Sequence, residues 1–151
     1  MASIEDYRPE WATDFKALNM AWLEQYFQPE PFDQEVLSHP EQYILDSGGA
    51  IFFVVESDRP LGTVAIMYNQ QGELELTKMA VSNAARGRGF GNYLMQAAID
   101  AARTRGAREL VLYSNTLLAP AIGLYRKFGF KEVGAFHSEY ERCNIKMSRV
   151  L

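Results

Sequence analysis

The chain has 151 residues, a formal net charge of −4 and one cysteine. This length fits one domain with a full hydrophobic core, so we expect a single domain over residues 1–151. The longest apolar run, Ala50 to Val55, is too short to cross a membrane, and the acidic N-terminus does not have the pattern of a signal peptide. A lone cysteine excludes an internal disulfide and indicates a cytoplasmic protein, and the lack of a dense basic stripe argues against nucleic acid as a partner.

The N-terminal third is predicted to form a short strand followed by two helices. The strand is expected over Ile4 to Arg8. Apolar residues then recur at helical spacing from Pro9 to Tyr26, and the prolines that follow end this helix. Asp33 is placed to cap a second, short helix.

The rest of the chain alternates β-rich segments with helical ones. Further strands are predicted at Ile51–Glu56, Leu61–Tyr68, Glu73–Ser82, Leu110–Tyr113, Phe130–Val133 and Cys143–Val150, and further helices at Phe90–Arg105 and Ala119–Phe128. The first three of these strands should pair antiparallel because short turns join them, whereas the helix after the third predicts a parallel pair. These elements predict an α/β (α+β) fold with a mixed, mainly antiparallel sheet of six to seven strands and about four helices.

A loop of glycines and arginines separates the third of these strands from the helix that follows it. The first N–H groups of a helix have no partner within it and lie at the positive end of its dipole, so they bind phosphate where side chains leave room. Gly87, Gly89 and Gly91 leave that room, and Arg86 and Arg88 add positive charge. A tight strand-to-helix turn is the alternative explanation of the glycines.

The spacing of this loop excludes two common phosphate-binding motifs. No Lys followed by Ser or Thr comes after the glycines, as a Walker loop requires, and the spacing G-x-G-x-x-G is absent. What remains is R-x-x-G-x-G, formed by Arg86, Gly89 and Gly91. On this motif the chain resembles the GNAT superfamily of N-acetyltransferases, in which this loop binds the pyrophosphate of acetyl-coenzyme A. Residues 73–81 and 109–130 also resemble that family's two cofactor-facing segments.

The resemblance implies that the two parallel strands splay apart to form a cofactor cleft, with residues 73–130 as the cofactor-binding core. Main-chain groups of the first strand would bind the pantetheine arm, and Asn115 would bind it from the second strand. The implied contacts with acetyl-CoA are Met79, Ala80, Val81, Arg86, Gly87, Arg88, Gly89, Phe90, Gly91, Asn115, Ala121 and Tyr125. No metal is implied.

Glu75 is the candidate general base. An attacking amine is mostly protonated at neutral pH, so its proton needs an acceptor. Glu75 lies six residues before Val81, the spacing at which the histone-acetylating branch of the superfamily carries its catalytic glutamate. Strand alternation predicts that Glu75 shares a face with Met79 and Val81. The alternative is a solvated position on a half-buried strand.

Tyr125 is the candidate general acid. It lies in the segment Leu-Tyr-Arg-Lys-Phe-Gly-Phe, where many relatives aim a hydroxyl at the sulfur of coenzyme A. A phenol can give a proton to a departing thiolate if it lies close to it. The alternative is a helix tyrosine that packs against Ile122 and Phe128.

The acceptor site is expected in the helical region over residues 11–46. Ten of the 19 acidic residues lie in the first fifty positions, which favours a cationic acceptor. Glu24, Glu30 or Asp33 would then steer the cation. The candidate aromatic substrate residues are Trp22, Tyr26, Phe27 and Phe32, with burial in the core as their alternative role.

Four other conspicuous residues are interpreted as structural. Lys78 inside a strand is either a partner of a carboxylate or phosphate or, as we expect, a side chain that extends to solvent at a strand edge. His39 and His137 lack metal-ligand spacing, and Cys143 is expected to pack in the last strand.

The sequence therefore predicts an N-acetyltransferase that moves an acetyl group from acetyl-CoA directly to a primary amine. The acceptor is a small molecule or an amino group of a protein. Two alternatives remain: an acyltransferase with another acyl-CoA or acceptor class, and a noncatalytic acyl-CoA sensor. Many relatives are dimers, so the resemblance also allows a homodimer.

Overall fold

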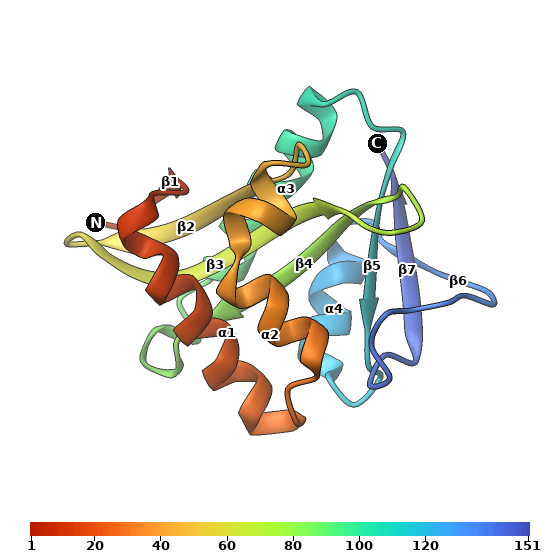
Figure 1. The fold of residues 1–151 in the computed structure, drawn as a ribbon, viewed down its shortest axis with the longest axis horizontal. Helices are drawn as coiled ribbons and strands as arrows, with labels where there is room; N and C mark the ends of the chain where they lie inside the picture. The colour runs from red at the N-terminus through yellow and green to blue at the C-terminus, as the bar shows by residue number, and fades with distance from the viewer.

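The computed structural model describes residues 1–151 as a seven-stranded sheet with helices on both faces (Figure 1). The strand order is β1-β2-β3-β4-β5-β7-β6, and only β4 and β5 pair in parallel. The strands are β1 (Ser3–Asp6), β2 (Ala50–Glu56), β3 (Arg59–Tyr68), β4 (Leu74–Val81), β5 (Glu109–Ser114), β6 (Lys131–Val133) and β7 (Ile145–Val150). The α-helices are α1 (Ala12–Tyr26), α2 (Pro31–Ser38), α3 (Phe90–Thr104) and α4 (Ala119–Lys127). This architecture confirms the predicted mixed, mainly antiparallel fold.

Three shorter helical turns complete the chain. They are η1 (Pro9–Trp11), η2 (Glu41–Leu45) and η3 (Asn83–Ala85), of which η2 is a π-helical turn. The sequence did not predict η2, which packs Ile44 into the core. None of the helices combines the length and apolar character that crossing a membrane requires.

Two buried clusters of side chains attach the helices to opposite faces of the sheet. On one face α1, α2 and η2 pack through Phe15 and Phe53, which are both fully buried. On the other face α3 packs through Leu94 and Ile99, and α4 adds Leu124 at the edge of the same cluster. Figure 1 shows α1 and α2 in front of the sheet and α3 and α4 behind it. Full burial of each large apolar side chain stabilises such a fold by about 1.5–3 kcal/mol.

The parallel strands β4 and β5 separate toward their carboxyl ends. Their register contains the single pair Glu75–Val111, although β4 continues for six residues beyond Glu75. On its other edge β4 stays paired with β3 as far as Val81. The predicted splay is therefore present, and Glu75 lies where the two strands begin to part.

A β-bulge in β4 changes which side chains share a face. The register against β3 shifts between Thr63 and Ala65, and Lys78 has a φ of +54°, a left-handed conformation that side chains rarely adopt. Before the bulge Glu75 lies opposite Met67 and so faces α1 and α2. After it Met79 packs against the α3 cluster. The prediction that Glu75, Met79 and Val81 share one face is therefore wrong, because one extra residue inverts the alternation.

Candidate active site

Three adjoining cavities run across the molecule at the splay. The loop cavity, of about 480 Å³, lies between α1, the end of β4, the start of α3 and α4. The central cavity, of about 70 Å³, lies between β4, β5 and the loop before β7. The outer cavity, of about 190 Å³, lies beyond Glu75, between α2, η2 and the turn after β3. Trp22, Met79, Leu118 and Tyr125 line both the loop cavity and the central cavity, and Glu75 and Tyr140 line both the central and the outer cavity.

The loop cavity has the properties of an anion site. Gly87 and Gly89 have φ values of +81° and +79°, which glycine adopts without strain. Gly89 is the N-cap of α3, and Gly89, Phe90 and Gly91 line the cavity where the first amides of this helix have no preceding turn to bind. Arg86 is the only charged residue among those that line it. Met79, Ala80, Val81, Phe90, Gly91 and Ala121, all predicted cofactor contacts, also line this cavity.

The two arginines of the loop have different environments. Arg86 lines the loop cavity and donates hydrogen bonds to the side-chain oxygens of Gln25, at 3.0 Å, and Tyr26, at 3.5 Å. Arg88 does not line it, because its guanidinium forms a bidentate pair with Glu56 at 2.6 and 3.0 Å. The structure thus leaves Arg86 as the charged side chain of the loop cavity and directs Arg88 toward β2.

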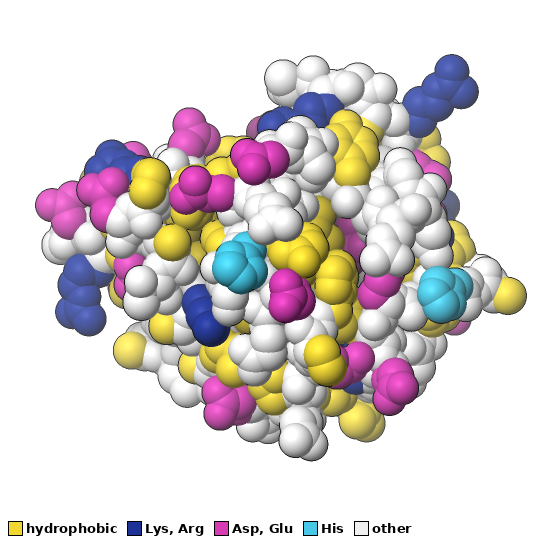
Figure 2. All heavy atoms as spheres, in the orientation of Figure 1, with side chains coloured by type: hydrophobic (Ala, Val, Ile, Leu, Met, Phe, Trp, Pro, Cys, Tyr) yellow, Lys and Arg dark blue, Asp and Glu magenta, His cyan; other side chains and the backbone are white.

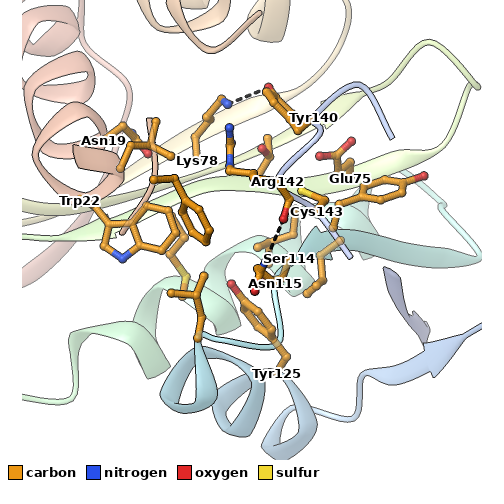
Figure 3. Close-up of a pocket in the computed structure, with 18 residues that line it drawn as sticks. Asn19, Trp22, Glu75, Lys78, Ser114, Asn115, Tyr125, Tyr140, Arg142 and Cys143 are labelled. Carbon is orange, nitrogen blue, oxygen red and sulfur yellow. Dashed lines mark hydrogen bonds between the residues drawn. The ribbon is translucent and has the colours of Figure 1, made fainter. Parts of the chain in front are cut away.

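Asn115 belongs to the central cavity. Its Nδ2 donates to the carbonyl oxygen of Arg142 at 2.6 Å (Figure 3). Its Oδ1 accepts from the amide of Leu117 at 2.8 Å. Both polar atoms therefore have partners within the chain. The geometry shows Asn115 fixing the loop before β7 against the end of β5.

Glu75 lies in the wall between the central and outer cavities. It is 4% exposed, and one hydrogen bond reaches its carboxylate, from Nδ2 of Asn69 at 3.3 Å. Burial raises the pKa of Glu75 to about 7, and the charges of Glu139 and Glu73 add to the rise, whereas the Asn69 hydrogen bond and the Lys78 charge oppose it. A carboxyl group with this pKa can accept a proton near neutral pH.

Tyr125 lines both the loop cavity and the central cavity, so its side chain lies at the junction between them. Figure 3 shows its ring extending from α4 toward Ser114 and Asn115. Burial raises the pKa of Tyr125 to about 12, although a hydrogen bond with Ser114 acts in the opposite direction. The ring packs edge-on against Phe130, with centroids 6.3 Å apart. Tyr125 therefore packs in the core and also presents a protonated hydroxyl to the cavities.

A buried ionic clasp, formed by Glu30, Asp33, Lys78, Tyr140 and Arg142, closes one side of the central cavity. The Asp33 carboxylate accepts hydrogen bonds from Nζ of Lys78 at 2.9 Å and from both terminal nitrogens of Arg142 at 2.6 and 2.9 Å. Nζ of Lys78 also donates to the Tyr140 hydroxyl at 2.7 Å. Burial alone would raise the pKa of Asp33, but these two cations outweigh it and hold the pKa below its ordinary value.

The clasp corrects three expectations. The Lys78 side chain is 4% exposed, so it does not extend to solvent but pairs with a carboxylate, the alternative role considered for it. Asp33 is fully buried, so it does not steer a ligand from outside. It lies at the third position of α2 and not before the helix, but its carboxylate does cap the helix start, because it accepts a hydrogen bond from the amide of Glu30 at 2.8 Å. Glu30 accepts hydrogen bonds from the amides of residues 141 and 142. The bulge explains Lys78, because its left-handed backbone turns the side chain toward α2.

Comparison with protein-family models identifies the family of this chain. The model of the acetyltransferase (GNAT) family matches residues 12–130. The chain belongs to the GNAT family. It is 36% identical over 98 residues to streptothricin acetyltransferase of Streptomyces lavendulae, which covers 64% of this chain and 52% of that protein. It is 32% identical over 96 residues to human N-acetyltransferase 8B, covering 60% and 42%. The chain spans about half the length of these curated relatives.

Solved structures confirm the GNAT fold. A GNAT acetyltransferase from Staphylococcus aureus Mu50 superposes with a TM-score of 0.88 over 99% of both chains at 18% identity. An acetyltransferase from Clostridium acetobutylicum, solved with acetyl-CoA, gives a TM-score of 0.74 at 15% identity and covers 93% of this chain and 96% of that one. At these identities the likeness concerns the fold alone.

The four aromatic residues predicted for the acceptor do not form one pocket in this GNAT member. Tyr26 lines the loop cavity, Trp22 lines both the loop and central cavities, and Phe27 lines the central cavity. Phe32 lines the outer cavity. Glu24 is exposed on α1 and lines none of the three. The helical region therefore contributes to both sides of the splay.

Three residues of the central cavity were not among those that the sequence assigned to the site. Tyr140, Arg142 and Cys143 lie in the loop before β7, which begins at Ile145, so Cys143 lies outside the strand in which we expected it. Burial raises the pKa of the Cys143 thiol above its ordinary value, which disfavours the reactive thiolate. No local pattern marks these positions, because the fold alone brings them to the cavity.

Proposed function

We propose that this GNAT member is an N-acetyltransferase that moves an acetyl group from acetyl-CoA directly to a primary amine of a small molecule or a protein. The observation that carries the proposal is that Glu75 and Tyr125 line the same central cavity, one near each of the cavities that adjoin it. A proton acceptor and a proton donor thus line one and the same cavity.

The loop cavity fits coenzyme A. Its amides at the start of α3, its two left-handed glycines and Arg86 suit a diphosphate, and it contains no carboxylate. The main-chain groups of Met79, Ala80 and Val81 follow the bulge along the same cavity, where the pantetheine arm would lie. When bound there, acetyl-CoA supplies an activated acetyl thioester.

The chain's own residues supply the proton transfers. Glu75, with a pKa of about 7, takes up the proton that the acceptor amine gives up. Tyr125 keeps its proton at neutral pH, since its pKa is about 12, and donates it toward the departing sulfur. The buried Cys143 thiol is poorly suited to act as a nucleophile, which favours direct transfer over a covalent enzyme intermediate.

Two measurements test the proposal. Calorimetric titration with coenzyme A tests binding at the loop cavity, and release of free thiol in the presence of a panel of amines tests catalysis. We expect tight binding, turnover with at least one amine, and loss of turnover in Glu75→Gln without loss of coenzyme A binding. A protein that binds coenzyme A and acetylates no amine of a broad panel would refute catalysis and support an acyl-CoA sensor.

A further inference from the structure

The outer cavity is an aromatic and acidic space on the far side of Glu75 from the loop cavity. It is lined by Phe32, Tyr43, Tyr68, Glu75, Glu139 and Tyr140 among others. These residues come from α2, η2, the end of β3, β4 and the loop before β7. Because Glu75 and Tyr140 also line the central cavity, a molecule in the outer cavity reaches the proposed base without crossing the loop cavity.

The charges of the outer and loop cavities are opposite. The outer cavity has two carboxylates, Glu75 and Glu139, and no Lys, Arg or His among its lining residues. The loop cavity has Arg86 and no carboxylate. Glu139 forms no hydrogen bond or ion pair through its side chain, whereas nearby Glu73 pairs with Lys146. The half-buried Glu139 carboxylate is thus a free negative charge at the outer cavity.

Aromatic rings form the other part of this wall. The Phe32 ring packs edge-on against Tyr43, with centroids 6.1 Å apart, and tilted against Tyr140, with centroids 5.5 Å apart. Tyr68 is 38% exposed and also lines the cavity. Aromatic faces beside carboxylates attract ammonium groups through both charge and the ring quadrupole. Figure 2 shows, on this face of the molecule, exposed hydrophobic side chains bordered by acidic ones, with most lysines and arginines at the periphery.

We propose that the outer cavity admits the acceptor, that it selects cationic amines without a neighbouring carboxylate, and that Glu139 sets this selectivity. The inference rests on the proposed acetyltransferase function and narrows its substrate class. A free amino acid would bring its own carboxylate close to Glu139 and Glu75, where no cation of the cavity could pair with it. Like charges in a partly desolvated site repel strongly enough to lower binding about tenfold or more.

The test compares pairs of acceptors that differ in one carboxylate. Alaninamide and alanine, and propylamine and β-alanine, are assayed for kcat/KM by thiol release with the wild type and with Glu139→Gln. We expect the wild type to prefer the partner without a carboxylate in each pair by about tenfold or more, and Glu139→Gln to reduce that ratio at least threefold, mainly through KM. The decisive quantity is the change of this preference ratio from the wild type to Glu139→Gln. The different pKa values of the two amines affect both proteins equally and therefore cancel.

Glu132→Gln is the matched control, since this carboxylate is exposed on β6 and lines none of the three cavities. It should leave both ratios unchanged, and coenzyme A affinity should be equal in all three proteins. Equal ratios in the wild type and Glu139→Gln would overturn the inference while the acetyltransferase function stands. Should no amine be acetylated, the proposed function fails by itself, and calorimetric binding of the same pairs still measures the selectivity of the outer cavity.

Discussion

Replacing Glu75 by glutamine measures how much a buried carboxyl group between the central and outer cavities lowers the free energy of unfolding. Burial raises the pKa of Glu75 from 4.5 to about 7. Between these pH values the folded protein keeps a proton that the unfolded chain has released, so the free energy of unfolding falls as pH rises through this window. A shift of this size corresponds to about 3 kcal/mol, reached in full above pH 7.

Glutamine keeps the shape of Glu75 and can accept the hydrogen bond from Asn69, but it does not ionise. The free energy of unfolding of Glu75→Gln, relative to the wild type, should therefore increase by about 3 kcal/mol between about pH 4 and about pH 8.5. Urea unfolding at several pH values measures this difference, with the exposed Glu132→Gln as control. A difference that does not change with pH would refute the raised pKa and, with it, the reason for choosing Glu75 as the base.

The same substitution should make the protein a poorer catalyst while it becomes more stable at alkaline pH. In the wild type, kcat/KM should rise with pH up to about 7, as Glu75 loses its proton, and this rise should be absent from the variant. Turnover should fall about a hundredfold. Such an exchange of stability for activity is typical of residues that function in a destabilised state.

Three further substitutions separate the roles of the site residues. Tyr125→Phe should lower kcat about a hundredfold with unchanged coenzyme A affinity, because only the donated proton is lost; a kcat equal to that of the wild type would contradict its role. Gly89→Val forces a branched side chain into a φ of +79° beside the loop amides, so calorimetry should detect no coenzyme A binding, whereas Gly123→Ala, in open space on α4, should bind normally. Asp33→Asn leaves two buried cations without their carboxylate and should lower the free energy of unfolding by about 3–5 kcal/mol, whereas Glu56→Gln at the exposed pair should change it little.

The sheet, the four α-helices and the glycine loop were predictable because their signals are local. Apolar periodicity, turn residues and prolines act over a few positions, and the loop motif lies within six residues. The splay of β4 and β5 came from the family resemblance together with the helix that connects them. Glu75 and Tyr125 were singled out on the same motifs, and they prove to line one cavity.

The bulge and the clasp were not predictable, because they depend on contacts between distant segments. Lys78 was recognised as unusual in a strand, yet its partners Asp33 and Tyr140 lie 45 and 62 positions away. The sequence does not indicate the left-handed backbone at position 78, because the residue there is a lysine and not the glycine that usually adopts this conformation. Glu139 and Arg142 reach the cavities only because β7 pairs between β5 and β6.

The clasp also has a consequence for how the protein folds during synthesis on the ribosome. Arg142 binds Asp33 across 109 positions of sequence, and Glu30 holds amides 111 and 112 positions further on. The N-terminal carboxylates therefore emerge long before their cations have been translated, and a nascent chain must keep them hydrated until that moment. Helix α2 can make these contacts only after Arg142 has been translated.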